Sequence, residues 1–294
     1  MYQLDAQARR PAELGPESLL WRWAGDTRIG LLAGPVGLLQ TMHPAIGAAL
    51  VDHSDFFTDP ANRVVRSLPP ILGSVYDGPD EGTGKAVRDY HRDIKGHDAK
   101  GRRYHALDPG TYWWAHATFQ YMVEQVADRF ERRPLTPYER EQLYQEGVAW
   151  YLRYGVSDRC VPETRAAFQQ QWDYYCEEVL EPNPAANWLL DGLAGRQLAP
   201  ISTLPPPIPK WVVPATNVKL LRRIALPSGR VVVYGGLPPR VRERFGLRWT
   251  RVHELRLSAL DAAVRRTWHK LPQWIRWQPR ARAGWQRVGR TPPR

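Results

Sequence analysis

Proline stands at the start of several apolar segments of this chain, and this pattern restricts its fold more than any other feature. At one such start Thr136 precedes the proline and Glu139 follows three residues after the threonine, which is a helix capping box. Proline suits the first turn of an α-helix because the amide proton that it lacks would have no partner there. The β-branched run at 231–234 does not alternate with polar residues as a half-buried strand does. We therefore predict an all-α fold, with helices beginning at Pro44, Pro109, Pro137 and Pro162.

The other glycine and proline residues that interrupt helices indicate the boundaries of helices within one large domain. Glycine closes a short helix at the N-terminal end, and the glycine-bounded segment 96–110 is predicted to be a loop. The PPPIP segment at 205–209 favours extended backbone. The remaining helices are predicted at about 17–24, 83–95, 211–226, 239–246 and 250–270. We expect an extension at 1–16, a main domain at 17–270 and a frayed, basic Trp/Arg-rich tail at 271–294.

The net positive charge of the chain comes from its C-terminal quarter. Residues 220–294 hold 18 Lys or Arg against three acidic residues, whereas residues 1–219 hold 23 basic and 27 acidic residues. This makes the basicity a local surface property. The chain has no apolar run of the roughly 18 residues that a membrane span needs and no secretory leader, so we expect a cytoplasmic protein.

Two histidines are the best candidates for chemistry, because the chain has no phosphate-binding loop, nucleophile elbow, HExxH or CxxC motif. His91 lies in VRDYHRDIKG, with Arg88 one helical turn before it and Lys95 one turn after, and His116 lies in YWWAHATF. A neutral imidazole that projects from a helix into an apolar slot can ligate haem iron, and flanking cations on the same face can meet the propionates. Packed core histidines without a ligand are the alternative that spacing leaves open.

A basic face upstream is the second candidate. On a helix, Arg63, Arg66 and Ser67 share one face, where two guanidinium groups and a hydroxyl can bind an anion or polarise dioxygen. Composition alone equally fits a solvated basic surface.

Taken in order, several motifs resemble those of the rubber oxygenase and MpaB-type oxygenase family, which is all-α and carries b-type haem. They are GDTRIGLLAGPVGLLQTMHPAIGAALVDHSDFF at 25–57, DPANRVVRS, RDYHRDIKG, RRYHALDP and WWAHAT, with LPPRVRERFGLRW at 237–249. The resemblance implies a single multi-helix oxygenase domain that encloses a haem pocket.

The resemblance also assigns residue roles. It implies that His91 is the proximal iron ligand, preceded by Arg88. Arg63, Arg66 and Ser67 occupy the positions of the Arg-x-x-Lys-Thr group on the oxygen side. His116 matches the WxHAT motif of the MpaB-like and bacterial branches and is the second candidate ligand. The implied activity is haem b-dependent oxygenation, with O₂, of an apolar, alkene-containing substrate, with an electron donor that the sequence does not indicate.

Two other functions fit the same residues. One is a haem peroxidase or haem-binding protein of the same fold. The other is a non-enzymatic basic protein that docks on an anionic membrane or on nucleic acid through its C-terminal region, where arginines alternate with Trp268, Trp274, Trp277 and Trp285. Nucleic acid is the less expected partner, because the region has no recognised nucleic-acid motif.

Overall fold

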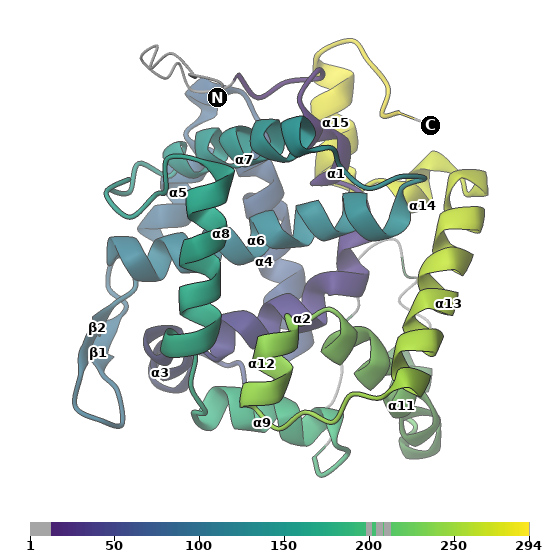
Figure 1. Cartoon of the computed structure of the whole chain (residues 1–294). Helices are drawn as coiled ribbons and strands as arrows, with labels where there is room; N and C mark the ends of the chain where they lie inside the picture. The colour runs from purple at the N-terminus through teal and green to yellow at the C-terminus, as the bar shows by residue number, and fades with distance from the viewer. Residues whose placement is uncertain (1–12, 198–201, 204–207, 209–212, 294) are drawn as a thin grey trace, which may run out of the picture.

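The computed structural model describes residues 13–197, 202–203, 208 and 213–293. The described part is helical apart from one two-stranded hairpin, which confirms the predicted all-α class. The PPPIP segment and most of the N-terminal extension lie outside the described residues. Figure 1 shows how the helices surround a common centre.

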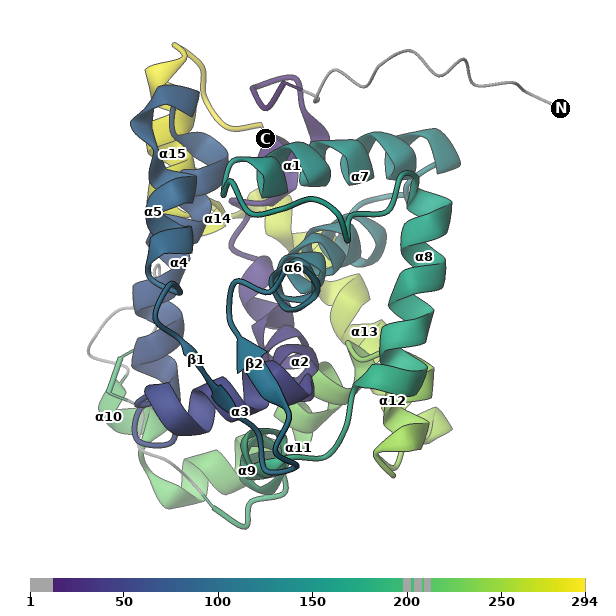
Figure 2. The ribbon, with the colours of Figure 1, turned by 90° about the vertical axis from the view of Figure 1, so that its left-hand side faces the viewer.

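The centre of the fold is α6 (Pro109–Phe130), the longest helix. It lies end-on in the middle of Figure 2, with the other helices around it. Trp113 and Trp114 on α6 are almost fully buried. Two helices of the first half of the chain, α1 (Leu19–Trp23) and α2 (Ile29–Thr41), pack directly against α6. The other elements of this half are α3 (Pro44–His53), which packs on α2, and α4 (Pro60–Tyr76), η1 (Pro79–Glu81) and α5 (Thr83–Asp89), of which α4 and α5 pack on each other.

The predicted helix starts are confirmed with one shift. Asp108 caps α6 by accepting from the amides of Gly110 and Thr111. Thr136 and Glu139 form the capping box of the next helix. The helix predicted from Pro162 begins three residues later, because Thr164 accepts from the amide of residue 167 and makes the cap. These helices are α7 (Pro137–Leu152) and α8 (Arg165–Tyr174), followed by η2 (Tyr175–Val179) and α9 (Pro184–Leu193).

The helix predicted over 83–95 is too long. It ends at Asp89, and the predicted loop that follows contains an antiparallel hairpin of β1 (Lys95–His97) and β2 (Arg103–His105), with Gly96 opposite Tyr104. The Asp98 carboxylate accepts from the amides of Lys100 and Arg102 and closes the turn, where Gly101 has a φ of 76°. Such side-chain-to-backbone bonds compete with helix formation.

The C-terminal part is more ordered than predicted. The run at 231–234 lies in a helix, and the helix predicted at 211–226 is instead a short turn followed by a longer helix. The tail is not frayed: Trp277 and Trp285 are buried, and the last helix packs against α4. The elements are α10 (Val213–Thr216), α11 (Lys219–Gly235), α12 (Pro239–Arg244), α13 (Arg251–Thr267), η4 (Trp268–Lys270), α14 (Gln273–Arg276) and α15 (Pro279–Arg287).

No single helix in the described ranges is both long and apolar enough to span a membrane. Only α2 and α3 taken together reach that length and composition, and they meet at a bend of 96°.

Candidate functional site

His91 lies in the turn that follows α5, with one ring nitrogen bonded and the other free. Its Nδ1 is 2.9 Å from the carbonyl oxygen of Val87. Because a carbonyl only accepts, Nδ1 carries the proton and Nε2 presents its lone pair. Within the described part of the chain, Nε2 has no hydrogen-bond partner. This is how a histidine that ligates a metal through Nε2 is usually oriented.

The surroundings of His91 keep its imidazole neutral. Burial lowers the pKa of His91 below its usual value, and the positive charge of Arg63 lowers this pKa further. The ring stands edge-on to Tyr112, with 5.7 Å between the ring centroids. A neutral imidazole is the form that binds iron.

Arg63, Arg66 and Ser67, which were predicted to share one helix face, have different surroundings in the structure. Arg63 is partly buried, and its guanidinium donates to the hydroxyl of Ser54. Arg66 is exposed and pairs with Asp55 at 3.2 Å. Ser67 is partly buried on the same helix, α4. The structure therefore brings Arg63 into the electrostatic neighbourhood of His91, whereas Arg66 faces solvent.

Arg88 and Lys95 do not share a helix face with His91, because α5 ends before it. Arg88 pairs with Asp89 at 2.8 Å and donates to the carbonyl of Gly155 at 3.5 Å. Lys95 is exposed on β1. Lys95 is therefore not one helical turn after His91, whereas the His91 amide donates to the Arg88 carbonyl at 2.9 Å, so that Arg88 stays one turn before it. The roles of both cations towards haem propionates stay predictions.

His116 is buried inside α6 and already uses its Nε2. That nitrogen is 2.9 Å from the carbonyl oxygen of Gly147, so Nε2 carries the proton. Its Nδ1 is buried without a partner among the described residues. Burial lowers the pKa of His116 to about 3. Four aromatic rings enclose the imidazole, those of Trp113, Trp150, Tyr151 and Tyr154.

A third imidazole, that of His43, is also buried. It stacks on Tyr175 at a centroid separation of 5.9 Å, and its Nδ1 has no partner in the described ranges. Burial lowers the pKa of His43 to about 4. The one sequence signal for this site was the His-Pro pair at the start of α3, which places the histidine at the helix N-cap.

The glycines of α2 share one helix face but have different surroundings. A methyl group at Gly34 would lie 2.7 Å from Cγ2 of Val233, so α11 packs closely there. No described atom lies within 4 Å of such a group at Gly30 or Gly37. Space for a larger group thus exists on either side of this helix contact.

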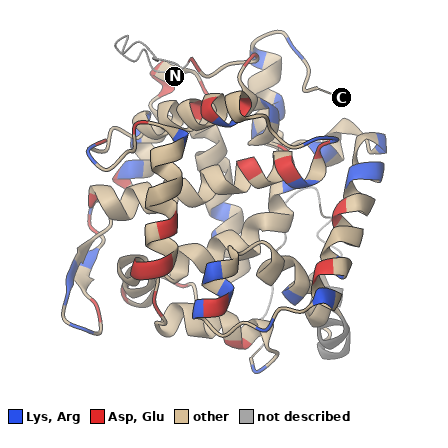
Figure 3. Ribbon diagram, viewed as in Figure 1, with Lys and Arg blue, Asp and Glu red and all other residues tan. Residues whose placement is uncertain are grey.

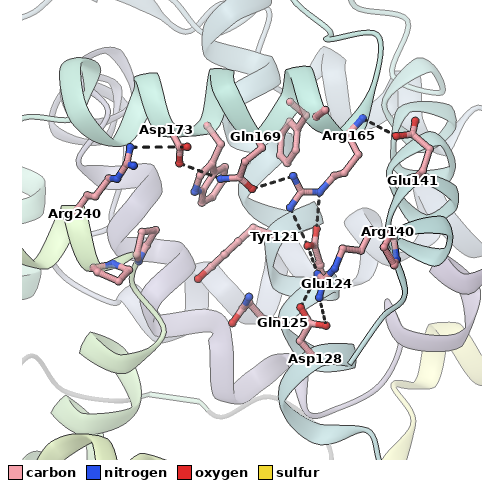
Figure 4. A pocket seen from close by; sticks show the side chains of 16 residues that line it. Tyr121, Glu124, Gln125, Asp128, Arg140, Glu141, Arg165, Gln169, Asp173 and Arg240 are labelled. Carbon is pink, nitrogen blue, oxygen red and sulfur yellow. Dashed lines mark hydrogen bonds and ion pairs between the residues drawn. The ribbon is translucent and has the colours of Figure 1, made fainter. Parts of the chain in front are cut away.

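Two cavities lie away from His91. The larger, of about 810 Å³, lies between α6, α8 and α12, and neither His91 nor Arg63 lines it. In Figure 4, Arg140 and Arg165 converge on Glu124, at 2.6 and 2.9 Å. The second cavity, of about 400 Å³, lies beside α1 and η4, and the same two residues are absent from its lining.

Two arginines of the basic C-terminal region form ion pairs with carboxylates near the end of α4. Arg280 pairs with Asp77, and Arg287 pairs with Glu81 at 3.0 Å. In Figure 3, α13 carries both basic and acidic residues along its length. Trp274 is the one tail tryptophan that is largely exposed in the described structure. Docking of this region on an anionic membrane, as hypothesised from the sequence, stays a prediction.

The described part of the chain contains no group of three or more His, Cys, Asp or Glu side chains arranged to hold a metal ion. A porphyrin supplies four nitrogen ligands itself, so a single free imidazole such as that of His91 is a sufficient protein ligand.

Fold and site define a large all-α protein with neutral, buried or half-buried imidazoles near its central helix. The chain belongs to the family described as "ER-bound oxygenase mpaB/B'/Rubber oxygenase, catalytic domain", whose model matches residues 21–289. It is therefore a member of an oxygenase family, and the match runs through the C-terminal helices. No curated protein and no solved structure matches the chain.

Proposed function

We propose that this protein is a haem b-dependent oxygenase that acts with O₂ on an apolar, alkene-containing substrate. The observation that carries the proposal is the state of His91, whose Nδ1 is held by the Val87 carbonyl while its Nε2 lone pair is free. Membership of the oxygenase family supports the reaction class. His116 is the weaker ligand, because its Nε2 is bonded to Gly147.

We assign three residues to the haem group of this proposal. His91 would hold the iron through Nε2. Lys95 is exposed and has no carboxylate partner in the described structure, so it is free to pair with a propionate. Arg88 would do so by exchanging Asp89 for the propionate. When bound, haem supplies the binding and activation of O₂.

The chain's own contribution is orientation and charge. The Ser54 hydroxyl accepts from Arg63 and so restricts the direction of that guanidinium. Preorganised N–H donors of this kind stabilise negative charge that develops on oxygen during a reaction. Arg63 would act in this way, and the Ser67 hydroxyl one turn later on α4 would add a second donor.

The first test is reconstitution of the full-length protein with haem b, followed by its absorption spectrum. We expect a Soret band at a stoichiometry of one haem per chain. A protein that gives no Soret band after reconstitution would rule out the haem part of the proposal. Turnover of an alkene with O₂, compared with turnover with hydrogen peroxide, then separates an oxygenase from a peroxidase of the same fold.

A further inference from the structure

The smaller cavity is lined by an excess of arginine. It lies between α1, the end of α6 and the η4–α14 segment, and has a volume of about 400 Å³. Trp23 and Trp268 contribute indole rings to its wall. Its charged lining residues are Arg22, Arg28, Glu131, Arg132, Arg133, Glu139, Arg265 and Arg276.

The two carboxylates of the lining are already paired. Glu131 accepts from Arg28 at 2.7 Å, and Glu139 accepts from Arg133 at 2.7 Å. In the described structure, the other four arginines have no carboxylate within ion-pair distance. These are Arg22, Arg132, Arg265 and Arg276.

Arg276 is the strongest indication of a missing partner. Arg276 is only 6% exposed, and its Nε has no hydrogen-bond partner among the described residues. Its Nη2 donates to the carbonyl of Pro293 at 3.3 Å. A buried charge without an ion-pair partner is costly. Burial lowers the pKa of Arg276, and the carboxylates of Asp26 and Glu131, which lie beyond ion-pair distance, offset this only in part. An anion in the cavity would compensate this charge.

We propose that this cavity binds the phosphate group of an organic phosphate. A phosphomonoester carries nearly two negative charges and three acceptor oxygens at neutral pH, which suits several convergent guanidinium groups better than a single carboxylate does. The indole rings of Trp23 and Trp268 provide an apolar wall for the organic part. The proposal does not depend on haem, because His91 and Arg63 lie outside this cavity.

The phosphate can come from a soluble metabolite or from a lipid headgroup. The full-length protein is titrated with phenyl phosphate while its thermal unfolding is followed. In parallel, it is sedimented with phosphatidylcholine vesicles that do or do not contain phosphatidic acid. We expect stabilisation by phenyl phosphate if the source is soluble, and binding only to phosphatidic acid vesicles if the source is a lipid. Absence of both responses would overturn the proposal.

Substitutions connect the response to this cavity. Arg132→Ala combined with Arg265→Ala removes two exposed guanidinium groups, and we expect about a tenfold loss of affinity for the probe that binds. Arg256→Ala is the matched control, since Arg256 is an exposed arginine on the same helix as Arg265 but does not line the cavity. An equal loss of affinity in the control variant would show that arginines attract the anion unspecifically, and it would contradict a phosphate site in this cavity.

A second variant addresses the buried charge directly. Arg276→Met should abolish the response to the phosphate probe. In the absence of the probe, the variant should be as stable as the wild type or more stable, because a buried charge without an ion-pair partner is removed. A variant that folds and still responds to the probe like the wild type would refute the role of Arg276.

Discussion

His91 and His116 lie in aromatic surroundings near the same central helix, yet they differ in which ring nitrogen is bonded. His91 donates from Nδ1 to the Val87 carbonyl and leaves Nε2 free, whereas His116 donates from Nε2 to the Gly147 carbonyl. His91 is also partly exposed, whereas His116 is enclosed by rings. The comparison teaches that the ring nitrogen bonded by a backbone carbonyl decides which nitrogen keeps its lone pair. In His91 that lone pair is on a partly exposed residue, whereas in His116 it is enclosed by aromatic rings.

The largest expected effect is on haem binding. His91→Asn retains a side-chain donor for Val87 but removes the Nε2 lone pair, so we expect haem affinity to fall by about 100-fold or more. His116→Gln retains a donor near Gly147 and should keep most of the bound haem. Absorption titration with haem measures both. Loss of haem in His116→Gln with retention in His91→Asn would reverse the assignment of the ligand.

The two histidines should also differ in how a charged neighbour affects the reaction with oxygen. Arg63 is close enough to His91 to lower its pKa, whereas no charged group affects the pKa of His116 in this way. Arg63→Ala should leave haem bound and raise the barrier of oxygen turnover by about 2.7–4 kcal/mol. Arg66→Ala is the control, because Arg66 is exposed and pairs with Asp55. Wild-type turnover in Arg63→Ala would show that this residue is part of a solvated surface.

For the free energy of unfolding we expect the opposite ranking, with a larger loss on substitution of His116 than of His91. His116→Ala removes the hydrogen bond to the Gly147 carbonyl and leaves a cavity among four aromatic rings, so we expect a loss of about 3 kcal/mol in the free energy of unfolding. His91→Ala removes a partly exposed ring and should cost about 1 kcal/mol or less. Urea unfolding of both variants without haem measures the difference. Equal losses would mean that His91 is also mainly a packing residue.

The last expected effect is a pH dependence of the free energy of unfolding that originates at His116 and is gradual, because it is spread over several pH units. Its folded-state pKa is about 3, below the usual value of 6.5, so the unfolded chain takes up the proton first as the pH falls. Stability is therefore fully present above about pH 6.5 and decreases towards pH 3, by up to about 1.4 kcal/mol per pH unit from this group. The slope should be shallower in His116→Gln. Parallel curves for the two proteins would show that His116 does not titrate on unfolding.

Local signals predicted much of the helical framework because they act over a few residues. Asp108 and Thr136 cap the helices that follow them, as their positions before proline indicated. The sequence analysis missed the end of α5, where tight turns at 88–94 replace the α-helical bonds, and the hairpin that follows, whose turn is closed by Asp98. His91 stays a predicted iron ligand, and the helix face that it was expected to share with Lys95 is absent, because α5 ends at Asp89 and Lys95 lies on β1.

The sequence by itself determined the fold class, the capped helix starts and the residue types available for chemistry, because these follow from spacing and side-chain character. Only the tertiary structure decided which ring nitrogen of His91 is free, which of Arg63 and Arg66 lies near it, and that Arg276 is buried without a carboxylate partner in the described structure. Each of these depends on contacts between segments far apart in the chain. Burial and the pairing of charges are properties of such contacts, so no local pattern of residues specifies them.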